Sequence, residues 1–308
     1  MESHFIGEAA AISVSLLWTS CSLLFAFAGK RVGVLSVNAL RIVMAVGLLC
    51  IAHIVVLGTL IPSANGSQWL YMGLSGVIGL SIGDFCYFGS LVMLGPRRGV
   101  LLMATNPIFA TVTAMFLLNE VPNWVKLLGI GVTVAGVLWV IMESEEKSRE
   151  KAIDRKAKTY GVLLGIGGSV GQGVGLVLSK YGMNNAASDQ ASPLNPLTAT
   201  LMRMVVAAVF FWAVILLMRK APEVFRAFGD RKAVGSMFSG AIFGPFLGVW
   251  LSMVAITYTL TGVAATLMSL MPLMIIPIMW GLYGQRTSWR GFLGAVIAIA
   301  GIALLFLA

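Results

Sequence analysis

Long apolar runs recur along this chain, and each is long enough to cross a lipid bilayer as a helix, which takes about 20 residues. Hydrophobic residues make up 58% of the 308 residues and charged residues only 11%, against about 45–50% and about 25% in soluble domains. A water-soluble fold of this length could not bury so much apolar surface. We therefore predict an all-α integral membrane protein whose solvent is the bilayer.

The apolar runs predict ten transmembrane helices, five on each side of a charged break that contains Glu145, Glu146 and Lys147. The expected spans are 7–28, 34–57, 69–94, 99–118, 124–142, 160–183, 196–218, 233–257, 261–283 and 291–307. Because the break cannot lie in lipid, we predict a first repeat at residues 6–143, a charged linker at 144–158 and a second repeat at 159–308.

The two halves repeat each other in sequence. An offset of 165 positions pairs like residues without a gap, including Pro, Trp and ordered Gly pairs that chance matching in apolar sequence rarely gives. The pairs are Gly79 and Gly244, Gly83 and Gly248, Pro107 and Pro272, Trp124 and Trp289, Gly129 and Gly294, and Gly136 and Gly301. With a shift of three residues, Arg41 also meets Arg203.

An odd number of helices in each half makes the second half enter the membrane from the opposite side. Such inverted repeats are typical of secondary transporters, whose substrate site lies near the midplane between the halves. Duplication can also build a larger bundle with no transport role, and this alternative stays open.

Basic residues predict the orientation. Of the 21 Lys and Arg residues, 17 fall in the central linker and in the loops that share its side, and only Lys126 and Lys180 lie on the other side. Cytoplasmic loops are rich in Lys and Arg. We therefore expect the linker in the cytoplasm and both termini outside the cytoplasmic (inner) membrane.

The order of motifs within each half resembles the drug/metabolite transporter superfamily, specifically its ten-helix EamA-type members, over nearly the whole chain. The stretches that carry the resemblance are Asn106-Pro107-Ile108, Leu117-Leu118-Asn119-Glu120, Leu127-Leu128-Gly129 and Ala135-Gly136-Val137, with Met271-Pro272-Leu273, Tyr283-Gly284-Gln285 and Gly294 to Gly301 in the second half. Leu40-Arg41, Met202-Arg203 and Trp18 also match the family pattern. Gln285 departs from it, because the family favours Glu there.

The resemblance implies a metabolite exporter or importer that is often driven by an ion gradient. Family substrates include amino acids, sugars, nucleosides and amphipathic drugs. We therefore expect a secondary transporter that works by alternating access, with protons as a candidate coupling ion.

Charged side chains inside a membrane are costly, so each one is a candidate functional residue. Asp84 falls midway along the third span, with Tyr87 on the same helical face. A carboxylate there can carry a proton. The alternative is a structural salt bridge with Arg41 or Arg97.

Arg41 and Arg203 lie about 10 Å inside their helices. Inverted symmetry would place them on opposite faces of a shared cavity, where each could bind an anionic group of the substrate. Asn38 and Thr200 lie three residues earlier, on the same faces. The alternative is that both arginines snorkel to the interface or tie helices together.

Further candidates are expected to line the cavity or to shape it. Pro107, Pro272 and Pro277 would kink the fourth and ninth helices, either as hinges or only as part of the bundle's shape. The other cavity candidates are the polar residues Asn106, Gln172 and Tyr258 and the aromatic Trp18, although a Trp in the core or at the interface is commoner. Glu120 is expected to cap or orient the turn into the fifth helix.

Other functional classes fit the sequence less well. An intramembrane enzyme needs a nucleophile with a base or a set of metal ligands, yet the two histidines are His4 and His53. We expect no enzymatic activity, cofactor or metal. A membrane scaffold or sensor would usually carry a soluble domain, and a channel would show rings of pore-facing charge. The net charge of +9 shows no basic face typical of nucleic-acid binding. The expected partners are a small solute, protons and lipid, and the sequence predicts no oligomeric state.

Overall fold

The computed structural model describes residues 2–94, 99, 102–145, 155–184, 192–271, 273–274 and 289–307, and all regular elements among them are helices. The first half contains α1 (Glu2–Val32), α2 (Val34–Leu57), α3 (Gly66–Ser75), the π-helix η1 (Gly76–Gly83), α4 (Asp84–Leu94), α6 (Asn106–Leu117) and α7 (Trp124–Glu145). The second contains α8 (Arg155–Asn184), α9 (Pro196–Leu217), α10 (Ala221–Arg226), η2 (Ala227–Gly229), α11 (Arg231–Ala241), the π-helix η3 (Ile242–Gly248), α12 (Val249–Tyr258), α13 (Thr261–Met268) and α15 (Trp289–Leu307).

Six of the described helical segments are long and apolar enough to cross a bilayer. They are Phe5–Val32, Val34–Leu57, Gly66–Ser90, Lys158–Asn184, Pro196–Leu217 and Arg231–Tyr258, and the shorter apolar helices are Asn106–Leu117, Trp124–Trp139 and Trp289–Leu305. The chain is therefore an all-α, multi-pass membrane protein, as the apolar runs predict.

Local sequence signals end and start several of these helices. Gly33, the single residue between α1 and α2, has a φ of 82°, which a residue with a side chain rarely adopts. Asn65 opens α3 with a capping box, in which its side chain accepts from Gln68 N while Gln68 accepts from Asn65 N. Asn195 caps α9, which then begins with Pro196.

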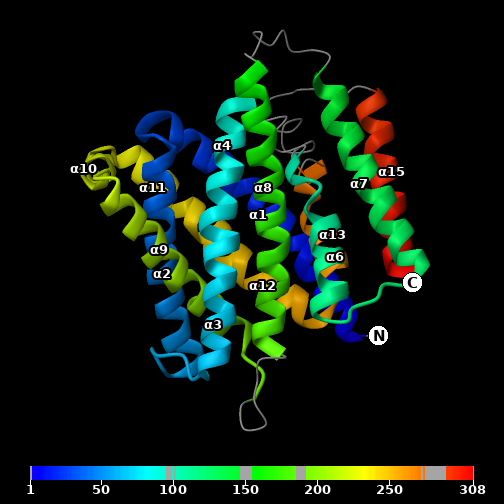
Figure 1. The fold of residues 1–308 in the computed structure, drawn as a ribbon, viewed down its shortest axis with the longest axis horizontal. Coiled ribbons are helices and arrows are strands. Elements are labelled where there is room, and N and C mark those ends of the chain that lie inside the picture. The colour runs from blue at the N-terminus through cyan, green and yellow to red at the C-terminus, as the bar shows by residue number, and fades with distance from the viewer. Residues whose placement is uncertain are drawn as a thin grey trace.

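The ends of the chain lie on one side of the bundle (Figure 1). The last turn of α7 and the first turn of α8 lie on the opposite side. Each half thus crosses the bundle an odd number of times, as inverted repeats require.

The third span of each half contains a π-helical segment at equivalent positions. Gly79 and Gly83 lie in η1, and Gly244 and Gly248, which follow at the 165-residue offset, lie in η3. A Cβ at Gly83 would lie 3.3 Å from Gln172 N on α8, and one at Gly244 would lie 2.9 Å from Cys21 Sγ on α1. The glycines therefore let the third span of each half press against the first helix of the other half.

The fourth and ninth spans, in which prolines were expected to produce kinks, are broken by turns at equivalent positions. The chain turns at Ala104 and Thr105 before α6, and at Ser269 and Leu270 after α13. Pro107, which we expected to kink a helix, lies in the first turn of α6. A proline lacks the N–H that would bond one turn back, so a helix can begin here but not continue through. Pro272 and Pro277 lie outside the described residues.

Helices α7 and α15 pack through glycines in a reciprocal pattern. A Cβ at Gly129 would lie 3.0 Å from Gly301 O, and one at Gly136 would lie 2.8 Å from Gly294 O. Because Gly294 and Gly301 are the repeat equivalents of Gly129 and Gly136, each glycine faces the equivalent of the other. This self-complementary contact is what a two-fold relation between the halves produces.

Ion pairs join the halves at both ends of the bundle. Beside the linker, Arg31 Nε at the end of α1 lies 2.7 Å from Asp230 Oδ2, before α11, and this hydrogen bond holds the pKa of Asp230 below its usual value. On the terminal side, Lys180 Nζ lies 2.6 Å from Glu120 Oε1. Glu120 also accepts from Thr261 N at 2.7 Å, at the start of α13.

Candidate functional site

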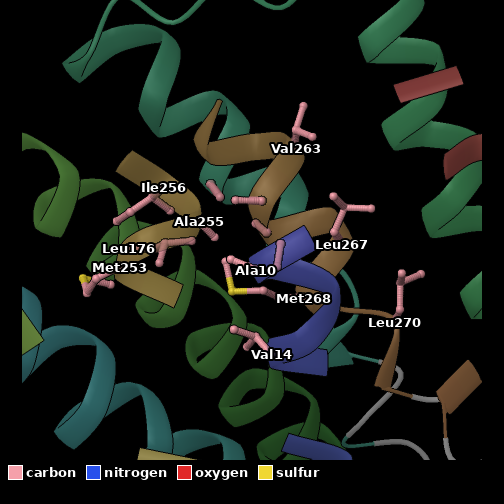
Figure 2. Close-up of a cluster of buried hydrophobic side chains, with 14 of the residues drawn as sticks. Ala10, Val14, Leu176, Met253, Ala255, Ile256, Val263, Leu267, Met268 and Leu270 are labelled. Atoms are coloured by element: carbon pink, nitrogen blue, oxygen red, sulfur yellow. The ribbon is translucent and has the colours of Figure 1, made fainter. Parts of the chain in front are cut away.

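Apolar side chains from both halves converge at the centre of the bundle. Figure 2 shows Ala10 and Val14 of α1 meeting Leu176 of α8, Met253 of α12 and Met268 of α13. All five are buried. Arg203 contacts Met253 of this cluster, and a hydrogen bond or charge in such apolar surroundings is weakly screened.

Asp84 is the first residue of α4, directly after the π-helix, and its carboxylate is held by two partners. Arg41 Nη2 of α2 donates to Oδ2 and forms an ion pair. Gln172 Nε2 of α8 donates to Oδ1 at 2.6 Å and also to Gly79 O at 3.0 Å. Asp84 therefore links both halves, and Arg41 is the salt-bridge partner that the sequence left open.

The Arg41 guanidinium is enclosed by aromatic rings as well as by Asp84. Its Cζ lies 5.1 Å from the ring centre of Phe88 and 5.6 Å from that of Phe25. Its Nε is buried without a hydrogen-bond partner. Arg41 thus stays inside the bundle and does not snorkel to the interface.

Arg203 of α9 is also buried, with 3% of its surface exposed. Glycines of η1 make room for it, because a Cβ at Gly76 would collide with its carbonyl oxygen and one at Gly79 would lie 3.3 Å from its Nη2. Nη1 lies 3.6 Å from the sulfur of Met253, a weak acceptor, and Nε has no partner. Among the described residues, no carboxylate forms an ion pair with Arg203.

A small cavity of about 30 Å³ lies next to Arg203, between the halves. The first half contributes Trp18, Leu80 and Asn106, and the second contributes Gln172, Leu176, Arg203, Val249, Ser252, Ala265 and Met268. This volume holds a water molecule or two and no metabolite. The Oδ1 atom of Asn106 is buried without a hydrogen-bond partner.

Four predicted candidates thus line the cavity, namely Trp18, Asn106, Gln172 and Arg203. Asp84 and Arg41 reach this group through Gln172. Two sequence arguments led to these positions: polar or charged residues inside apolar spans, and the tryptophan of the first helix.

The other candidates lie away from the cavity lining. Asn38 is buried in α2 with Oδ1 unpartnered, and Thr200 donates to Pro196 O within α9. Tyr87 packs beside Phe88, with ring centres 5.4 Å apart. Tyr258 ends α12 and is 41% exposed.

Val249 and Ser252 are lining residues that the sequence analysis did not single out. They are the repeat equivalents of Asp84 and Tyr87 at the 165-residue offset. The sequence offset already identifies Val249 as the equivalent of Asp84, and applying it to Tyr87 would have found Ser252. The apolar members Leu80, Leu176, Ala265 and Met268 have no such signal, because apolar residues are the rule in these spans.

The described part of the chain has no group of three or more His, Cys, Asp or Glu side chains that could hold a metal ion. The cavity combines the guanidinium of Arg203, the amides of Asn106 and Gln172, the hydroxyl of Ser252 and apolar side chains, which suits the binding of a small molecule. Such a mixture is typical of small-molecule sites.

Comparison with known proteins agrees with this arrangement. The family model of EamA-like transporters matches residues 5–142 and 159–307. The chain belongs to the EamA-like transporter family. This family is part of the drug/metabolite transporter superfamily, so the resemblance is confirmed, and the EamA-like protein is a membrane transporter at the level of its family.

A solved structure, described only as the crystal structure of a protein, aligns with the EamA-like chain at a TM-score of 0.74. The alignment covers 100% of this chain and 96% of that chain, at 15% identity, and so shows a shared fold alone. No curated protein sequence matches the chain.

Proposed function

We propose that this EamA-like protein is a secondary transporter that moves a small metabolite across the cytoplasmic membrane by alternating access. The observation that supports this most is the cavity between two inverted halves, lined from both and containing buried polar atoms without partners. Unmet hydrogen-bonding groups cost free energy in a dry interior, and a bound solute would satisfy them. Rocking of one half against the other would expose the cavity to each side in turn.

The described conformation fits a closed stage of this cycle. Its cavity is too small for a metabolite, and ion pairs join the halves at both ends of the bundle. Opening on the terminal side would separate Glu120 from Lys180, and opening on the linker side would separate Arg31 from Asp230. Substrate entry therefore requires one of these pairs to part.

We further propose that Asp84 couples transport to protons. Its carboxylate holds Arg41 of the first half and Gln172 of the second. Protonation would weaken both contacts and loosen the link between the halves, which would let a proton gradient bias the conformational equilibrium. A purely structural salt bridge is the competing role for the same contacts.

The test is uptake of a panel of metabolites into proteoliposomes, with and without a pH gradient, by the wild type and Asp84→Asn. Asparagine keeps the shape and can still accept from Arg41, but cannot carry a proton. We expect flux that the gradient stimulates in the wild type and that the variant loses, while elution volume and melting temperature show that it folds. If the pH gradient stimulates flux equally in Asp84→Asn and in the wild type, Asp84 is not the coupling residue. If the wild type moves none of the solutes, the proposal of transport is contradicted.

A further inference from the structure

Among the described residues around the cavity, two guanidiniums face one carboxylate, and only Arg41 forms an ion pair with it. Arg41 is neutralised by Asp84. Arg203 is 3% exposed and donates to the sulfur of Met253, and no carboxylate among the described residues lies within ion-pair distance of it. A buried cation without a counter-ion is strongly unfavourable, and a group that supplies a well-placed counter-ion reduces that cost.

Helix dipoles do not change this balance. Asn106, the first residue of α6, and Met268, the last residue of α13, both line the cavity. The partial positive charge at the start of α6 therefore faces the partial negative charge at the end of α13, and the two oppose each other. Arg203 remains the one charged residue of the described lining, and it forms no ion pair with a described carboxylate.

The rest of the lining limits the size and polarity of a ligand. Asn106 offers an amide with an unpartnered oxygen, and Ser252 offers a hydroxyl that donates to Val249 O. Leu80, Leu176 and Met268 form apolar wall. The lining thus has one cation, few polar groups and mostly apolar side chains. Such a lining fits a ligand with one anionic end and an apolar body.

We infer that the cavity binds a small organic monocarboxylate, with its carboxylate on the Arg203 guanidinium and its apolar body against α8 and α13. The planar guanidinium matches a carboxylate with two parallel hydrogen bonds. A phosphate monoester carries about two charges at neutral pH and would need a second free cation, which Arg41 does not supply because Asp84 holds it. This inference rests on the proposed function, since it names the substrate class of the same site.

The test compares probes that share a shape and differ in charge. Binding of benzoate, benzamide and benzylammonium, and of propionate, propanamide and propylammonium, is measured by calorimetry on the purified full-length protein. We expect at least one carboxylate to bind roughly 10- to 100-fold more tightly than its amide and its ammonium analogue, the range of a charge-assisted hydrogen bond. Equal or tighter binding of the amide or ammonium member, or binding of none of the six, overturns the inference.

Variants assign the preference to Arg203. We expect Arg203→Gln to abolish the carboxylate preference and Arg203→Lys to keep it at reduced affinity, because lysine retains the charge but not the planar fork. If Arg203→Gln does not fold, the comparison of Arg203→Lys with the wild type still tests the role of Arg203. An unchanged affinity of Arg203→Lys for the carboxylate would contradict a contact with the guanidinium. The control is Lys220→Gln, which removes an exposed cation that pairs with Glu223 outside the lining and should keep the preference; its loss would place the anion site elsewhere.

The outcomes separate this inference from the proposed function. Flux of neutral or cationic solutes only would leave transport standing and overturn the carboxylate assignment. Selective carboxylate binding without flux of any solute would keep the assignment and overturn transport.

Discussion

Buried charges in this protein differ in the partners they find. Asp84 and Arg41 neutralise each other, Glu120 and Lys180 do the same near the terminal side, and Arg203 has no counter-ion among the described residues. A matched buried pair is tolerated, while a single buried charge is expensive. Arg203, whose buried charge forms no ion pair with a described carboxylate, is therefore the residue that an anionic ligand would stabilise.

The Glu120–Lys180 pair gives a prediction at this scale. Both side chains are largely buried, 11% and 13% exposed. Glu120→Gln leaves Lys180 with Thr259 O but without a counter-ion, so we expect a loss of about 3 kcal/mol in unfolding free energy. Adding Lys180→Met removes the stranded charge and should restore part of that loss. Unfolding in a detergent series measures both, and a double variant less stable than the single one would refute the argument.

Interrupted helices are the main feature at the scale of elements. The fourth and ninth spans break at equivalent turns, and the third and eighth contain equivalent π-helical segments. Pro107 accounts for one break, and Pro245 lies inside the second π-segment. The residues next to these irregularities, Asn106 and Leu80 among them, line the cavity. The turns and the π-helical segments therefore lie beside the cavity, and residues in or next to them form part of its lining.

Glycines at the contact of α7 with α15 give the prediction for this scale. A Cβ at Gly136 would lie 2.8 Å from Ala298 Cα, which is backbone and cannot move aside, whereas one at Gly131 on the same helix meets nothing within 4 Å. We expect Gly136→Ala to lower stability by about 1–3 kcal/mol, and Gly131→Ala to raise it by up to about 1 kcal/mol, because alanine favours a helix more than glycine does. Melting temperatures measure the difference; equal values for the two would contradict the close packing.

At the scale of the whole molecule, two inverted halves enclose one polar site. The reciprocal glycine contact and the equivalent breaks show the repeat in three dimensions. The chemistry is not symmetric, because Asp84 has Val249 as its equivalent. The two halves thus share their backbone architecture, whereas differences at single residues give each half a different charge distribution.

Orientation in the membrane is testable with single cysteines. Ser67 at the start of α3 and Lys156 at the start of α8 are both exposed and belong to opposite sides of the bundle. From the bias of Lys and Arg, we expect a membrane-impermeant maleimide to label Ser67→Cys in intact cells and Lys156→Cys only after permeabilisation. The reverse labelling pattern would contradict the predicted orientation and place the linker outside the cell.

The sequence by itself determined the solvent, the helical class and the repeat, because hydropathy, span length and a constant offset are local properties that can be counted along the chain. It also pointed to most of the charged and amide residues around the cavity, since polar groups stand out in apolar spans. It did not separate cavity-lining residues from those elsewhere, such as Tyr258, which is 41% exposed.

The tertiary structure alone decided which buried groups neutralise each other. Asp84 lies 43 residues from Arg41 and 88 from Gln172 along the chain, and the sequence left both Arg41 and Arg97 as candidate partners. The pairing depends on how α2, α4 and α8 pack, because the free energy of a buried charge is set by the atoms within a few ångströms of it. That packing leaves Arg203 as the free cation of the described lining.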